Sequence, residues 1–212
     1  MTEVELTVKI KEFANDRQRR FAMARKRRPA TLAASKALEL SEHHNASTRP
    51  GKRLHEIGKI YPPVTWEMVR AVEDRLGFAL PTLLGRLWVE VGNGGFGPGY
   101  GLFGLDGGHV EENSRLTLPD LYFYTIEDPD LLLEPVDEDA QLSWNPPPWD
   151  PWPKKLVPIC NWGCGNESAI DCSTPEGEVI DLLDGIKRFF RESTFAQWME
   201  DWVNGVNLWD HL

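Results

Sequence analysis

The chain has 212 residues, of which 41% are apolar, and a formal net charge of −10 at pH 7. No apolar run approaches the roughly 20 residues that a membrane-crossing helix needs, and Met1–Glu5 is acidic where a secretory signal would be basic. A membrane protein and an exported protein are therefore not expected, and we predict a cytoplasmic location.

The charge is divided unevenly along the chain. Residues 1–60 contain 14 Lys and Arg against 7 Asp and Glu, whereas residues 61–212 contain 9 against 26, which gives about +7 and −17. An acidic body repels nucleic-acid phosphates and attracts basic proteins, most strongly at low salt. The alternative is that the negative charge only keeps the protein in solution.

Residues 1–55 are predicted to form a basic helical extension. Their apolar residues are too sparse to build a core, and Arg17–Arg28 is strongly basic. Such a helix can be solvated, can dock on the acidic body of its own chain, or can contact nucleic acid or a membrane surface, and these alternatives stay open. Because Arg49-Pro50-Gly51 is typical of a joint, the globular domain is expected over residues 56–212.

Two helices are predicted at the start of the domain. Thr65 is a plausible N-cap for the first helix, which Gly77 ends, and Pro81 suits the first position of the second. Gly92 is expected to take the left-handed conformation that ends this second helix. The apolar stripes of the two helices consist of Trp66, Val69, Val72 and Leu76, and of Leu83, Leu84, Leu87, Trp88 and Val91.

The middle of the chain is less regular. Tyr100–Leu105 alternates apolar residues with glycine, and Leu121–Ile126 is rich in aromatic and β-branched residues, so both are predicted to be short strands. Asp128–Asp139 is an acidic loop. Trp144–Pro153 contains too many prolines for a helix or a central strand, so we expect an extended loop with its tryptophans folded onto the body; a ligand for an aromatic groove is the alternative.

The last third of the chain predicts an antiparallel meander followed by a helix. Lys155–Cys160, Glu167–Cys172 and Val179–Leu183 are expected to be strands joined by glycine-containing turns. Thr194 and Gln197 then form a capping-box pattern, and the helix they open continues to Gly205. The predicted fold is α+β, with a mainly antiparallel sheet of about four to six strands, an N-terminal helical hairpin and a C-terminal helix.

Several motifs over about residues 60–205, in the order in which they occur along the chain, resemble those of the SUKH superfamily. The motifs are Trp66–Leu76 with Gly77, Leu80-Pro81, Asn93-Gly94-Gly95-Phe96, Val157-Pro158-Ile159, Gly163-Cys164-Gly165-Asn166 with Asp171, and Phe195-x-x-Trp198. Members of this superfamily include fungal cell-wall-assembly regulators and bacterial immunity proteins that neutralise polymorphic toxins.

The resemblance implies a non-enzymatic module that binds a protein. We expect an immunity protein that neutralises a basic toxin, often a nuclease in this family, because a nuclease needs a basic surface for phosphates. The alternatives are a regulatory scaffold of the cell-wall-assembly type and an orphan domain that binds another cytoplasmic protein.

The candidate binding residues are polar or aromatic positions beside turns. Asn and Asp beside glycines often hydrogen-bond their own turn, and most of the nine tryptophans must be core residues, so a structural role is the alternative for several of them. An exposed Trp, by contrast, is an effective hot spot. The candidates are Asn93, Trp162, Asn166, Asp171, Trp149 and Trp152.

No pattern indicates catalysis. Cys160, Cys164 and Cys172 include no C-x-x-C pair, and the five histidines are scattered without an evident nucleophile or metal partner. Residues 92–99 are glycine-rich but follow a helix and lack the phosphate-loop pattern. We therefore predict no enzyme activity, no metal and no cofactor, and nucleic-acid binding only through Arg17–Arg28.

Overall fold

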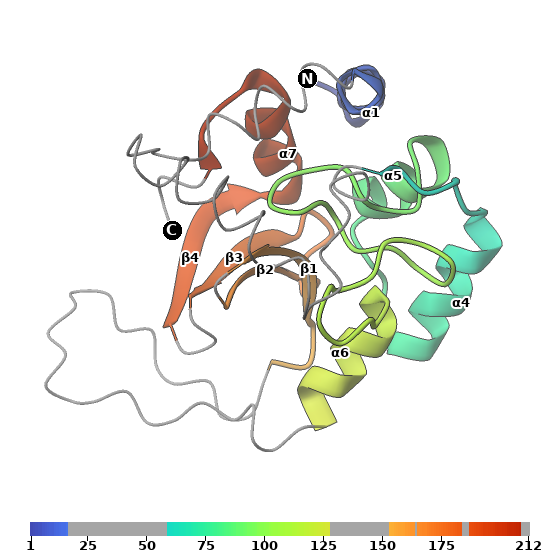
Figure 1. Cartoon of the computed structure of the whole chain (residues 1–212), viewed down its shortest axis with the longest axis vertical. Helices are drawn as coiled ribbons and strands as arrows, with labels where there is room; N and C mark the ends of the chain where they lie inside the picture. The colour runs from blue at the N-terminus through green and yellow to red at the C-terminus, as the bar shows by residue number, and fades with distance from the viewer. Residues whose placement is uncertain (17–58, 128–152, 164, 184–186, 209–212) are drawn as a thin grey trace, which may run out of the picture.

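The computed structural model describes residues 1–16, 59–127, 153–163, 165–183 and 187–208. In these ranges it is an α+β fold, as predicted, in which helices pack with an antiparallel sheet (Figure 1). The elements are α1 (Glu3–Asn15), α4 (Trp66–Leu76), α5 (Thr82–Glu90), α6 (Leu118–Glu127), β1 (Leu156–Gly163), β2 (Asn166–Asp171), β3 (Glu178–Leu183), β4 (Lys187–Thr194) and α7 (Phe195–Asn204).

The sheet is an up-and-down meander in the order β1-β2-β3-β4. This confirms the antiparallel meander, and it adds β4, which was not predicted. Because successive side chains on a strand point to opposite faces, Val157, Ile170 and Val179 join the core that the helices build. Figure 1 shows α4, α5 and α6 beside β1, with α7 above the sheet.

Local signals account for the ends of α4 and α7. The hydroxyl of Thr65 accepts from the backbone N–H of Met68 at 3.5 Å, and α4 ends at Gly77 with φ 82°. Thr194 caps α7 in the same way, and Gly205, also at φ 82°, ends it. The side chain of Gln197 donates to Asp201 instead of returning to the cap. Both helices are therefore confirmed.

The ends of α5 differ from the prediction. Pro81 is the N-cap residue, so the helix begins one position later at Thr82. Gly92 does not take the left-handed conformation, which occurs instead at Gly94 and Gly95, both at φ 82°. The requirement at Gly92 is space, since a Cβ there would lie 2.4 Å from the Cγ2 atom of Ile60.

Two predicted strands in the middle of the chain are wrong. Residues Leu121–Ile126 belong to α6, because Leu118, Leu121 and Tyr122 form a buried helical face that overrides their β propensity. Tyr100–Leu105 forms only an isolated bridge between Leu102 and Cys160. Here Gly101, at φ 103°, interrupts the extended backbone.

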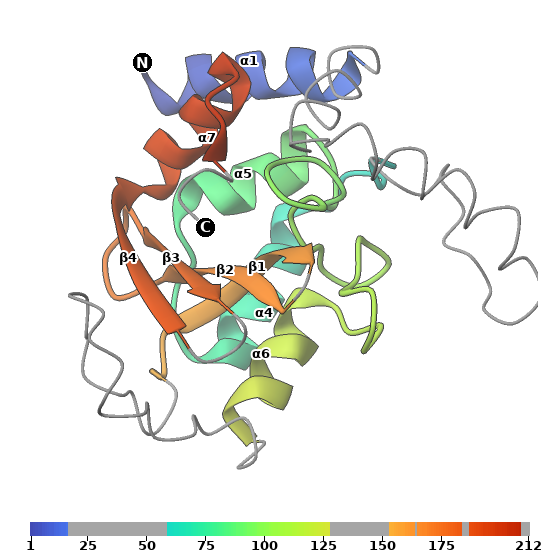
Figure 2. The same ribbon diagram turned by 60° about the vertical axis from the view of Figure 1, so that its left-hand side comes forward.

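The N-terminal segment also differs from expectation. The sequence predicts too few apolar residues here for a core, yet Leu6, Ile10, Phe13 and Ala14 of α1 are buried in the main hydrophobic cluster. Helix α1 packs on α7 and α5, and Figure 2 shows it lying across both. The boundary at residue 55 stays a prediction, because it lies outside the described residues, as do Arg17–Arg28, Asp128–Asp139, Trp149 and Trp152.

Candidate binding surface

Asn93 ties together the glycine-rich loop that follows α5. Its side-chain amide donates to the carbonyls of Leu105 and Asp106 at 3.3 and 3.1 Å, and its Oδ1 accepts from the Leu105 N–H at 2.7 Å. Its backbone N–H donates to the Tyr61 carbonyl at 3.0 Å, and its carbonyl accepts from the His109 N–H at 2.9 Å. Asn93 is buried, so its side chain serves the loop.

A second buried polar group crosses β1, β2 and β3. The indole N–H of Trp162 donates to the Ser168 hydroxyl at 2.7 Å, and that hydroxyl donates to the carboxylate of Asp181. Ser168 and Asp181 are direct partners in the β2–β3 register, and all three side chains are buried. This chain of hydrogen bonds gives the buried Asp181 carboxylate a donor. The only sequence signal for this group is the pair of polar residues, Ser168 and Asp181, at inward positions of β2 and β3.

A third polar group lies on β1, β2 and the loop before α6. The Glu111 carboxylate is buried; it accepts from the Asn113 N–H and the Ser114 hydroxyl, each at 2.8 Å. Its other oxygen accepts from the Asn161 amide at 3.3 Å. Asn161 in turn is the direct register partner of Glu167 on β2. The Asn161 amide thus donates to one carboxylate, while the residue itself pairs across the strands with a second acidic residue.

Glu167 is the electrostatically unusual member of this group. Partial burial, with the negative charge of Glu111 nearby, raises the pKa of its carboxyl from 4.5 to about 7. Burial and a neighbouring negative charge make the ionised form of a carboxylate unfavourable, and a cationic partner relieves that cost. Such a carboxylate therefore gains more from a cation than a carboxylate in water does. The arrangement therefore favours a Lys or Arg side chain from outside.

An aromatic side chain lies at the end of β1. Tyr100 is 40% exposed, and its backbone N–H donates to the Asn161 carbonyl at 2.7 Å. Its ring packs over Gly163, where a Cβ would lie 2.5 Å from the tyrosine oxygen. We call the exposed Tyr100 and the half-buried Asn166 and Glu167, together with the buried Glu111 and Asn161, the hairpin-end surface, since it lies where β1 turns into β2.

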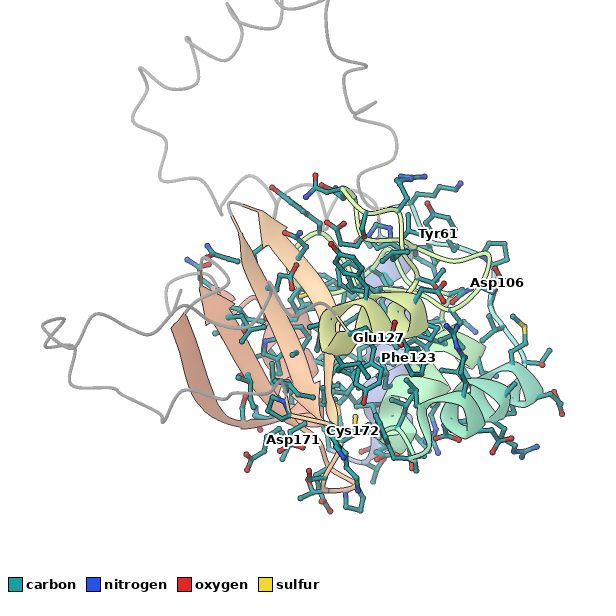
Figure 3. The ribbon with its side chains drawn as sticks, turned by 90° about the horizontal axis from the view of Figure 1, so that it is seen from below. Tyr61, Asp106, Phe123, Glu127, Asp171 and Cys172 are labelled. Atoms are coloured by element: carbon teal, nitrogen blue, oxygen red, sulfur yellow. The ribbon has the colours of Figure 1, made fainter. Side chains whose placement is uncertain are left out.

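The structure separates the sequence-predicted candidates. Trp162 and Asn93 are buried, whereas Asn166 is half-buried and belongs to the hairpin-end surface. Asp171 is at the opposite end of β2, where it accepts from the Ser173 N–H at 2.8 Å. Figure 3 shows Asp171 beside Cys172, well apart from Asp106 in the Asn93 loop. Sequence reasoning missed Glu111, Glu167 and Tyr100 as a group, because they come from three separate segments.

Comparison with protein families matches residues 63–201 to the SMI1/KNR4 family, SUKH-1. The chain belongs to the SUKH superfamily. This confirms the resemblance, and SUKH domains are generally non-enzymatic, bind protein partners, and include immunity and regulator proteins. Comparison with curated proteins and with solved structures gives no match.

The described part of this SUKH domain holds no group of three or more His, Cys, Asp or Glu side chains placed to bind a metal. Burial raises the pKa of the Cys172 thiol to about 12, with the charge of Asp171 adding to the effect. A thiol that stays protonated at neutral pH is a poor nucleophile and a poor metal ligand. Within the same ranges, none of the helices is long and apolar enough to cross a bilayer.

Proposed function

We propose that this SUKH domain is an immunity protein that binds and neutralises a basic protein toxin, of which a nuclease is the best fit. Family membership supports protein binding, and the partly exposed carboxyl of Glu167, with the negative charge of the buried Glu111 nearby, carries the proposal. A nuclease holds phosphates with Lys and Arg. An inhibitor with carboxylates at matching positions occupies that surface and excludes the nucleic acid.

The mode of binding follows from the site. A guanidinium placed against the partly exposed Glu167 favours the ionised form of its carboxyl and so lowers its raised pKa, and the negative charge of the buried Glu111 adds to the attraction. The exposed ring of Tyr100 covers the aliphatic part or the face of the same side chain. The net charge of −17 over residues 61–212 accelerates encounter with a basic partner, and this part of the attraction weakens with salt.

Co-expression tests the proposal. The protein is produced with the toxin domains of large modular secreted proteins encoded next to its gene, and cell survival is scored. We expect protection by the wild-type chain and at least tenfold weaker binding by the Glu167→Gln chain. The control is Glu176→Gln, which neutralises an exposed carboxylate in the turn after β2 and should protect fully. Absence of protection against every such toxin would contradict the immunity role.

A regulatory scaffold is the second candidate, and one observation favours it. Residues 1–62 lie outside the family match, and they contain Arg17–Arg28, which toxin neutralisation does not require. A scaffold should recover several housekeeping proteins with modest affinity when the tagged chain is purified from its own cells. Recovery of one tightly bound basic protein would favour the immunity role instead.

A further inference from the structure

Helix α1 contacts the rest of the protein as a bound amphipathic helix would. Its buried apolar side chains are Leu6, Ile10, Phe13 and Ala14, spaced by four, three and one residues, so they form one stripe. The opposite face carries the exposed Val4 and Val8. The stripe packs against α5 and α7, across which α1 lies in Figure 2, and we call the apolar surface that these two helices present to α1 the groove.

The contacts within this groove combine apolar packing with two polar contacts, one hydrogen bond and one ion pair. The ring of Phe13 meets the indole of Trp202 edge to face, with centroids 4.7 Å apart. The ammonium of Lys9 donates to Asn204 Oδ1 at 2.7 Å near the end of α7. At the other end of α1, Glu3 lies 4.0 Å from the guanidinium of Arg86 on α5. Because these two polar contacts involve different positions along α1, they determine which way the N-terminus of a helix in the groove points.

Helix α1 is also a self-contained unit. Thr2 and Glu5 form a reciprocal capping box, so the start of the helix needs no help from the domain. The family match begins at residue 63, and 42 residues, 17–58, lie between Asp16, the C-cap of α1, and Lys59. The groove therefore belongs largely to the SUKH domain, whereas the helix that fills it does not.

We propose that the groove between α5 and α7 is a helix-binding site that α1 occupies in cis and that accepts, in its place, an amphipathic helix of a protein partner. The partner helix carries the spacing Leu-x3-Ile-x2-Phe-Ala, with an acidic residue in its first turn for Arg86 and a basic one for Asn204. This is helix-in-groove recognition. This helix-binding site shares no residue with the hairpin-end surface, so its test is independent of the test of toxin binding.

Displacement by a labelled peptide of residues 1–16 tests this site. Against the full wild-type chain the peptide should bind weakly, because α1 competes from within the same molecule. Against a full chain with Ile10→Asp, whose own α1 places a carboxylate in the groove, it should bind at least tenfold more tightly. The matched control is Val8→Asp, since Val8 is 52% exposed and Ile10 is 0% exposed on the same helix. A peptide carrying Ile10→Asp should bind neither chain.

A folded Ile10→Asp chain, checked by circular dichroism, that binds the peptide no better than the Val8→Asp chain would overturn the proposal. If the Ile10→Asp chain does not fold, a protease site is placed within residues 17–58 of the wild-type chain. After cleavage, the N-terminal fragment should remain bound and exchange with the labelled peptide on dilution. Failure to exchange would make α1 a permanent core element and overturn the proposal. So would a wild-type dimer that the Ile10→Asp substitution dissociates, because a second copy would then be the occupant.

Discussion

Two polar groups lie on the same strands and behave differently. In the first, Trp162, Ser168 and Asp181 form a chain of hydrogen bonds that provides a donor for the only carboxylate in the group. In the second, the buried Glu111 accepts from Asn161 and from the loop before α6, whereas the partly exposed Glu167 feels the charge of Glu111 and has a raised pKa. Glu167 and Ser168 are adjacent in β2, so their side chains point to opposite faces of the sheet. The comparison separates buried carboxylates with donors of their own, Asp181 and Glu111, from Glu167, which is partly exposed and suited to an external cation.

The largest expected effect is on the hydrogen-bonded group. Replacing Asp181 with alanine leaves the buried Ser168 hydroxyl without its acceptor, and a loss of this kind costs about 3 kcal/mol of unfolding free energy. Urea denaturation measures it. The control is Glu178→Ala, an exposed carboxylate on the same strand, with an expected change within about 0.5 kcal/mol. A change below about 1 kcal/mol for Asp181→Ala would show that the group does not stabilise the fold.

The carboxylate pair should instead appear in the pH dependence. The pKa of Glu167 is raised from 4.5 to about 7, so the folded state binds its proton more tightly than the unfolded state. Its favourable contribution is complete below pH 4.5 and is lost as the pH rises through 7, a change of about 3 kcal/mol. Glu167→Gln should remove this slope.

His109 makes the unfolding free energy depend on pH with the opposite sign, so the wild-type chain must be compared with the Glu167→Gln chain at each pH. Burial, with Arg115 nearby, lowers the pKa of His109 from 6.5 to about 4. The folded state therefore loses stability as the pH falls below 6.5. Because both chains share this contribution, the difference in their unfolding free energies reports Glu167 alone. A difference that stays constant between pH 4.5 and 8 would contradict the charge pair.

Asn93 extends the comparison to the loop after α5. Asn93→Ala removes three side-chain hydrogen bonds to the Leu105 and Asp106 backbone and leaves the Leu105 N–H unpaired, at a cost of about 2 kcal/mol in thermal or urea unfolding. If the protein keeps its stability but loses partner binding, Asn93 would be a recognition residue and not a structural one.

The smallest stability effect is expected at Tyr100. Its ring is half exposed, so Tyr100→Ala should cost less than about 1 kcal/mol of unfolding free energy, while binding of a basic partner weakens severalfold through loss of the contact beside the carboxylates. Tyr100→Phe keeps the ring and should bind nearly as well as wild type. Equal loss in both variants would assign the effect to the hydroxyl.

Much of the fold follows from local rules in the sequence. The caps at Thr65 and Thr194 and the glycines at 77 and 205 act within a few residues, so α4 and α7 are predictable. The strand at Leu121–Ile126 was predicted from β propensity, but a buried helical face decided the outcome. The burial of α1 is likewise decided by tertiary packing. Its short apolar stripe is covered by α5 and α7, which lie far away in the sequence, so the stripe alone does not predict a core helix.

The candidate site was less accessible to sequence reasoning. Asn166 was singled out from its glycine turn, and it does lie at the hairpin end. Glu111 and Asn161 are 50 residues apart, and their hydrogen bond depends on how the loop before α6 packs on β1. No periodicity or motif encodes that packing, and the elevated pKa of Glu167 is a consequence of it.

The most direct test of the central claim is isothermal titration of the cognate basic partner, identified by co-expression, into the wild-type chain and the Glu167→Gln chain at two salt concentrations. The account predicts that the variant binds at least tenfold more weakly and with a shallower salt dependence, while its unfolding free energy at pH 7 is equal to or higher than that of wild type. Equal affinities and equal salt dependences for the two chains would contradict it.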